Sequence, residues 1–170
     1  MFVAFCALRA QKATNEKRGS TALPKAKKRQ LRKSYLYKMG TFDIGYYDYQ
    51  HRNQTDAFLP LIERLSDRRF WILATPIYWY TMSAQMKIFV DRLTDLITLR
   101  KDLGRMLHGK SLAVIASGSD ACLPEGFEFP FRLTCEYLGM KYIGTHYVPM
   151  EEDVSPQQLR SQVAGLGWVT

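Results

Sequence analysis

Clusters of cysteine or histidine are missing from this chain of 170 residues. The three cysteines, Cys6, Cys122 and Cys135, are far apart in the sequence, and the three histidines are equally scattered. Disulfide scaffolds, zinc sites and iron–sulfur clusters all need closely spaced ligands. The sequence therefore predicts no metal site and no disulfide framework. Dispersed thiols of this kind indicate a reducing compartment, so we expect a cytoplasmic protein.

Long apolar runs are also missing. No run approaches the roughly 20 residues that a helix needs to cross a bilayer. Residues 1–8 are apolar, but they are too short for a signal-peptide core and no basic segment precedes them. We therefore expect no membrane partner. The length of the chain and its 46% hydrophobic residues predict a single folded domain over residues 1–170.

The net charge of +8 is distributed very unevenly. Residues 1–40 contain 11 Lys or Arg and one acidic residue, whereas residues 41–170 contain 13 Lys or Arg and 15 Asp or Glu. Residues 9–38 are atypical: they are basic and show neither helical nor strand periodicity, so we expect disorder or weak helix there. A basic segment can bind nucleic acid or an anionic surface. Because a charge run is more often a solvated tract, nucleic acid is the less favoured partner.

The remainder of the chain alternates between strand-like and helix-like segments. Strands are expected at residues 1–8, 41–46, 70–74, 111–117 and 141–148, and helices at 56–65, 84–97, 127–138 and 155–163. Unalternating apolar runs such as 70–74 are typical of parallel strands buried on both faces. The pattern predicts an α/β protein with a flavodoxin-like, doubly wound sheet of five parallel strands and helices on both faces.

An aromatic segment follows the predicted strand at residues 70–74. Tyr78, Trp79 and Tyr80 come after a Thr-Pro turn and just before Ser83, which is placed to cap the next helix. Aromatic residues after a strand often simply cover the core, and taken alone that interpretation is favoured. Three adjacent aromatic side chains cannot all point inward, however, and Pro76 stiffens their turn. Such a segment suits a planar heterocycle with carbonyl acceptors, such as a flavin.

Residues 75–95, which begin Thr-Pro-Ile-Tyr-Trp-Tyr-Thr-Met-Ser, resemble the hallmark stretch of NAD(P)H-dependent FMN reductase-like flavoproteins with the flavodoxin fold. The resemblance extends over about residues 41–165. It implies an oxidoreductase in which FMN accepts hydride from NAD(P)H and passes electrons to a quinone, a flavin or another small-molecule acceptor. It also implies a homodimer. No catalytic acid or base is expected from the protein, because the flavin carries the chemistry.

The resemblance also implies two walls around the flavin ring. The first wall consists of Thr75, Pro76, Ile77, Tyr78, Trp79 and Tyr80, and the second of Ser117, Gly118 and Ser119. In a doubly wound sheet, the loops after the first, third and fourth strands meet at one edge, which would bring the walls together. The Asp91-Arg92 pair on the following helix is interpreted as a structural ion pair rather than a catalytic one.

The phosphate loop of the family is poorly matched. Family members begin with a strand that runs into Gly-Ser-x-Arg-x-x-Gly-Asn-Thr, which holds the FMN phosphate at a helix N-terminus. Here only Arg9 and Thr14 agree with that pattern. Resemblance is lost over residues 9–38 and returns abruptly near Thr41, which favours a compensated frameshift in the coding sequence. Two alternatives stay open: a flavodoxin-fold remnant with weakened or lost FMN binding, and binding of nucleic acid or an anionic surface through the basic segment.

Overall fold

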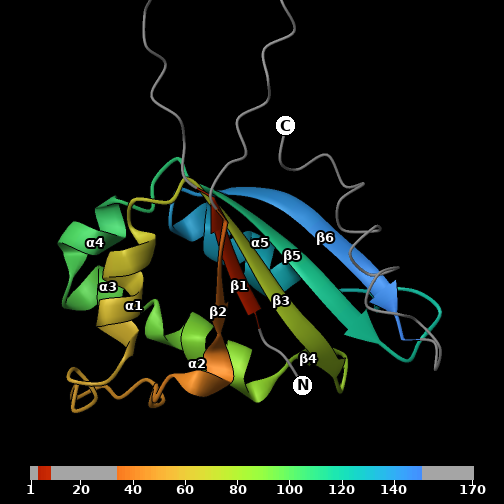
Figure 1. Ribbon diagram of the computed structural model, residues 1–170, viewed down its shortest axis with the longest axis horizontal. Helices are drawn as coiled ribbons and strands as arrows, with labels where there is room; N and C mark the ends of the chain where they lie inside the picture. The colour runs from red at the N-terminus through yellow and green to blue at the C-terminus, as the bar shows by residue number, and fades with distance from the viewer. Residues whose placement is uncertain (1–3, 9–33, 151–170) are drawn as a thin grey trace, which may run out of the picture.

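The structure is a computed structural model, and it describes residues 4–8 and 34–150 (Figure 1). In chain order the elements are β1 (Ala4–Leu8), β2 (Ser34–Lys38), the 3-10 helix η1 (Met39–Thr41), α1 (Phe58–Leu65), β3 (Phe70–Tyr78), β4 (Thr81–Met82), α2 (Ala84–Arg92), α3 (Asp95–Thr98), α4 (Lys101–Arg105), β5 (Ser111–Gly118), α5 (Phe129–Tyr137) and β6 (Lys141–Pro149). Within this part of the chain, every helix falls short of the length and apolar character needed to span a bilayer.

The sheet has the strand order β2-β1-β3-β5-β6, and the short β4 pairs with the end of β3. Counted along the chain without β4, this is the order 2-1-3-4-5 of flavodoxin-like folds. The predicted fold class, an α/β flavodoxin-like fold, is therefore confirmed. Strands β3, β5 and β6 are parallel, with Trp71 of β3 opposite Leu112 of β5.

The direction of β1 differs from the prediction of five parallel strands. It runs antiparallel to both neighbours, so that Ala4 lies opposite Ala74 and Leu8 lies opposite both Phe70 and Ser34. Neighbouring parallel strands need a long crossover, usually a helix, whereas antiparallel strands do not. The sequence after Leu8 lacks the apolar periodicity of a crossover helix. The local sequence pattern predicted β1 as a strand correctly, but the prediction that β1 runs parallel to its neighbours was wrong.

The second strand also lies elsewhere than predicted. It occupies Ser34–Lys38 instead of residues 41–46, because Tyr35, Leu36 and Tyr37 have side chains that favour strands. These residues lie inside the basic segment 9–38, and the many charged residues around them obscured this short strand pattern. Of residues 41–46, where the strand was expected, Thr41 ends η1 and the others have no helix or strand.

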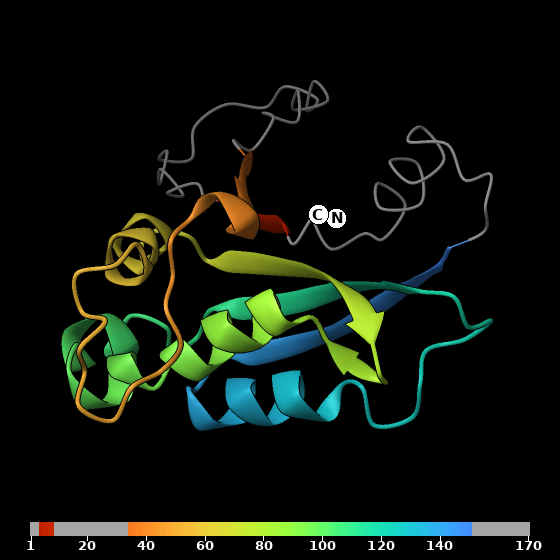
Figure 2. The same ribbon diagram turned by 90° about the horizontal axis from the view of Figure 1, so that it is seen from below.

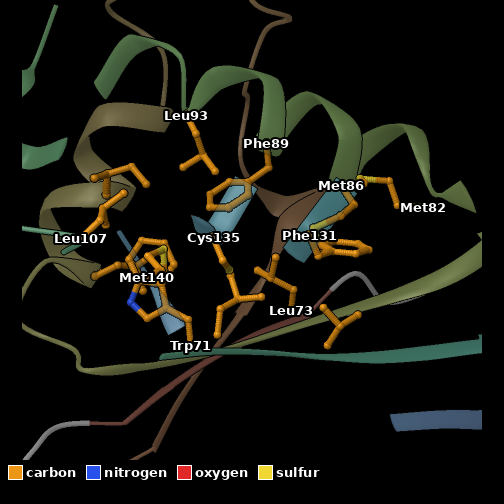
Figure 3. Close-up of a cluster of buried hydrophobic side chains, with 14 of the residues drawn as sticks. Trp71, Leu73, Met82, Met86, Phe89, Leu93, Leu107, Phe131, Cys135 and Met140 are labelled. Carbon is orange, nitrogen blue, oxygen red and sulfur yellow. The ribbon is translucent and has the colours of Figure 1, made fainter. Parts of the chain in front are cut away.

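The described helices pack on one face of the sheet. Residues at helical spacing on α1 (Phe58, Leu61, Ile62 and Leu65) join one buried cluster with residues from the other helices and from β3 and β5. Met86 and Phe89 of α2 point toward Trp71 and Leu73 of β3 (Figure 3). Helices α2 and α5 lie along the same side of the sheet (Figure 2). Among the described residues, helices thus cover one face, not both; the helix predicted at 155–163 lies outside them.

Candidate functional site

The predicted flavin-facing segment forms a β-hairpin. The strand predicted to end at residue 74 continues to Tyr78 and returns as β4, with Ile77 opposite Met82 and Tyr78 opposite Thr81. The two turn residues, Trp79 and Tyr80, have φ angles of 49° and 65°. Left-handed φ angles at both positions define the tight two-residue turn whose twist matches that of the strands. The first wall is therefore a rigid hairpin rather than an open loop.

The aromatic side chains of the hairpin face solvent. Trp79 is 91% exposed, Tyr80 68% and Tyr78 48%. The alternative that they only cover the core is therefore wrong. Residues other than glycine with positive φ are strained, and such residues gather at functional sites. Strain and exposure together make this turn a candidate binding surface.

The base of the hairpin is fastened to α2 by two buried hydroxyl groups. The backbone N–H of Ser83 donates to Thr75 Oγ1 at 3.1 Å, and the N–H of Met86 donates to Ser83 Oγ at 3.4 Å. Thr75 is 3% exposed and Ser83 is fully buried. The predicted N-cap at Ser83 is thus confirmed, and it connects the first wall to the helix that follows.

The second predicted wall lies directly beside the first. Pro76 pairs with Ser117 in the parallel ladder between β3 and β5. A Cβ atom added to Gly118 would lie 3.5 Å from the Cβ of Ile77 and 3.1 Å from the Oη of Tyr147. A side chain at this position would therefore contact Ile77 and crowd the Tyr147 hydroxyl, which glycine avoids. Ser119, the next residue, is exposed just beyond the end of β5.

Tyr147 of β6 supports the second wall and was not predicted. Its hydroxyl donates to the backbone carbonyl of Asp120 at 2.6 Å. Burial and the nearby Asp120 carboxylate raise the pKa of Tyr147, so the phenol stays protonated and can donate this bond at neutral pH. No local sequence pattern predicts this contact, because it depends on how β6 pairs with β5.

The two residues predicted to contact a phosphate, Arg9 and Thr14, lie outside the described residues. The position of β1 nevertheless bears on them. Leu8, at the end of β1, lies opposite Phe70, at the start of β3, whereas the two walls lie near Pro76. Six residues of strand separate these levels by about 20 Å. The prediction that the first-strand loop leaves β1 at the same edge as the other two is therefore wrong.

At the end of α2 away from the hairpin, a buried arginine joins the helix to the segment that precedes α1. Arg92 is 1% exposed and donates to Asp95 Oδ2 at 2.7 Å, to both carboxylate oxygens of Asp56, and to the carbonyls of Gly45 and Asn53. Burial raises the pKa of Asp56, but hydrogen bonds from Arg92 and from two backbone N–H groups outweigh it, so the pKa lies below its ordinary value.

The structural role predicted for Arg92 is confirmed, although its partner differs from the predicted one. Asp91, its neighbour in the sequence, pairs instead with Lys87 one turn earlier, with an Nζ–Oδ1 distance of 2.6 Å. Successive helical residues point in different directions, so Asp91 and Arg92 cannot share one face of α2.

A hollow of about 840 Å³ opens elsewhere, between α4 and α5, and is lined partly by Arg105, His108, Glu136 and Tyr137. His108 and Glu136 lie just before the starts of β5 and β6, so this hollow is at the amino-terminal edge of the parallel strands. In open α/β sheets, ligands bind beyond the carboxyl ends of the strands. The pair of walls at that edge is therefore the better candidate site.

Comparison with known proteins agrees with the fold and the resemblance. The family model described as flavodoxin-like fold matches residues 9–165, so the chain belongs to the flavodoxin-like fold family. Over 95 residues the chain is 34% identical to YwqN of Bacillus subtilis, whose name describes an NAD(P)H-dependent, FMN-containing oxidoreductase. That match covers 52% of this chain and 51% of YwqN, so the chain spans about half the length of this relative.

Two solved structures show the same similarity. The Trp repressor binding protein from Bacillus subtilis is 27% identical with a TM-score of 0.55, over 66% of this chain and 77% of that protein. An NADPH-quinone reductase from P. pentosaceus is 24% identical with a TM-score of 0.51, over 63% of this chain and 70% of that protein, which supports the fold alone. The predicted resemblance to FMN reductase-like flavoproteins is confirmed by the family model and by the similarity to YwqN.

Proposed function

We propose that this chain is a flavin-dependent oxidoreductase that binds FMN between its two walls and transfers hydride from NAD(P)H to a quinone, a flavin or another small acceptor. One observation carries the proposal: an exposed aromatic hairpin lies beside a small-residue loop at the carboxyl edge of parallel strands. That is where this fold binds its ligands. The name of the relative YwqN supports the cofactor and the co-substrate.

The residues of the two walls bind and orient the ring. Tyr78, Trp79 and Tyr80 supply aromatic surface for contact with a planar heterocycle. Gly118 leaves room for close approach of the backbone, and the buried Thr75–Ser83 contact keeps the hairpin in place. A bound flavin supplies the redox chemistry itself, so the protein has to provide position and electrostatics rather than an acid or base.

We test this proposal by the visible absorbance of the purified full chain with and without added FMN, followed by NAD(P)H oxidation with a quinone acceptor. We expect flavin uptake and acceptor-dependent oxidation. Gly118→Val should weaken flavin binding by at least about tenfold, because its side chain would press on Ile77 and Tyr147. Gly40→Ala is the matched control and should bind normally, since a Cβ atom there meets nothing within 4 Å.

The direction of β1 favours a second candidate, a flavodoxin-fold remnant that has lost FMN binding. A colourless protein that takes up no added flavin would support the remnant and overturn the first proposal. Equal flavin binding by Gly118→Val and the wild type would also contradict the proposed site, even if the protein were yellow.

We further propose that the chain acts in the cytoplasm as a homodimer. Tyr46 is 67% exposed and Tyr49 is 88% exposed in the segment before α1, which offers aromatic surface to a second copy. Sedimentation velocity would test this, and a monomer at micromolar concentration would contradict it.

A further inference from the structure

The two walls carry no positive charge. Residues 75–83 and 117–124 contain neither Lys nor Arg, and Asp120 is their only charged residue. Asp120 is exposed and lies two residues beyond Gly118, the last residue of β5. Phosphate groups in proteins are usually held by Arg or Lys side chains or by the free N–H groups of a glycine-rich loop at a helix N-terminus. The walls therefore suit the neutral ring of a flavin and disfavour a dianion beside it.

The end of β1, after which the family's phosphate-binding loop would begin, lies at the opposite edge of the sheet from the two walls. Leu8 and Ser34, which border residues 9–33, pair with each other at the level of Phe70. The walls meet at the level of Pro76 and Ser117, about 20 Å away along β3. Leu8, the last described residue of β1, thus lies at the end of the sheet remote from the walls.

Of the lysines that the structure describes, neither Lys38 nor Lys87 is placed to bind a phosphate at the walls. Lys38 ends β2 at the correct edge, but β1 lies between β2 and β3, which puts it two strand spacings, or about 10 Å, from the first wall. Lys87, on the first turns of α2, is paired with Asp91. At the start of α2, Ser83 Oγ already accepts the N–H of Met86.

From these contacts we propose that the chain recognises the isoalloxazine ring without a grip on the phosphate, so that FMN, riboflavin and lumiflavin are equivalent ligands. The proposal rests on the proposed flavin function and specifies its ligand class. Such a site binds a flavin that exchanges with solution, because no residue in the described part of the chain is placed to make the charge-assisted hydrogen bonds that normally retain FMN.

The experiment is a titration of each flavin with the full-length chain, followed by flavin fluorescence. We expect the Kd values for FMN, riboflavin and lumiflavin to agree within about threefold, and salt to have little effect on the FMN value. FMN binding tighter than riboflavin by tenfold or more would overturn the inference while leaving the proposed function intact. If Lys38→Ala abolished that preference, Lys38 would be identified as the phosphate ligand. Failure of all three flavins to bind would instead refute the proposed function.

A charge variant tests where the ring lies. Asp120→Lys exchanges an anion for a cation on the second wall, and the backbone carbonyl that Tyr147 binds is kept. It should make FMN preferred over riboflavin by about fourfold or more, because the local charge changes by two units near a phosphate in high dielectric. Ser66→Lys, a substitution at the far end of α1, is the control and should leave the ratio unchanged. An unchanged ratio in Asp120→Lys would overturn the placement of the ring between the walls.

Discussion

Replacing Arg92 with methionine should be among the most damaging single changes to this protein. The guanidinium makes five hydrogen bonds and is 1% exposed, and its partner carboxylates on Asp56 and Asp95 are also largely buried. Methionine has a similar volume but leaves both carboxylates without their shared cation. Removing one partner of a buried ion pair costs about 3–5 kcal/mol. That is a large part of the 5–15 kcal/mol by which domains are typically stable.

Urea unfolding followed by circular dichroism measures this loss. With a slope of about 2 kcal/mol per molar urea, the midpoint of Arg92→Met should fall by about 2 M. Arg100→Met is the matched control, because Arg100 also pairs with two carboxylates, Glu63 and Asp102, but on the protein surface. Water replaces those partners, so its midpoint should stay at the wild-type value. Equal midpoints for the two variants would refute the claim that burial makes Arg92 decisive.

Three further predictions concern the hairpin base, acid stability and thiol reactivity. Thr75→Val should lower the free energy of unfolding by about 1–3 kcal/mol, because the buried Ser83 N–H loses its acceptor; urea unfolding with Thr98→Val as an exposed control checks this. In the folded protein the pKa of Asp56 lies below its ordinary 3.8. The ionised carboxylate therefore contributes fully to the free energy of unfolding above pH 3.8, and this contribution is lost as the pH falls through the pKa of the folded state. Asp56→Asn should therefore be less stable than the wild type at neutral pH and lose less of its free energy of unfolding between pH 5 and pH 2. Equal losses in the two proteins over this pH range would contradict the prediction. Burial raises the pKa of the Cys135 thiol to about 12, so iodoacetamide at pH 8 should label the exposed Cys122 and spare Cys135 until urea is added, as peptide mass spectrometry can determine.

Most helices and strands could be predicted because each is encoded by a pattern of a few neighbouring residues. The cap at Ser83 and the start of β5 at Ser111 both follow from a few neighbouring residues. The closeness of Thr75 to Ser117 followed from a topological rule about strand ends.

Features that depend on pairing between distant segments could not be predicted in this way. The direction of β1 is decided by how it is connected to β2, and the role of Tyr147 depends on the register of β6 against β5. The extension of β3 to Tyr78 likewise needs β4 as its partner. A pattern within one segment contains no information about the segment that it will meet.

The turn at Trp79 and Tyr80 also bears on how this protein could be engineered. Asn-Gly is the pair best suited to the left-handed angles found there, and each bulky residue in that conformation costs of order 1–3 kcal/mol. A search for higher melting temperature would therefore favour Asn-Gly at these two positions and remove both aromatic rings. Selection for thermal stability would therefore favour residues at this turn that selection for ligand binding disfavours. A thermostabilised variant should be screened with ligand present.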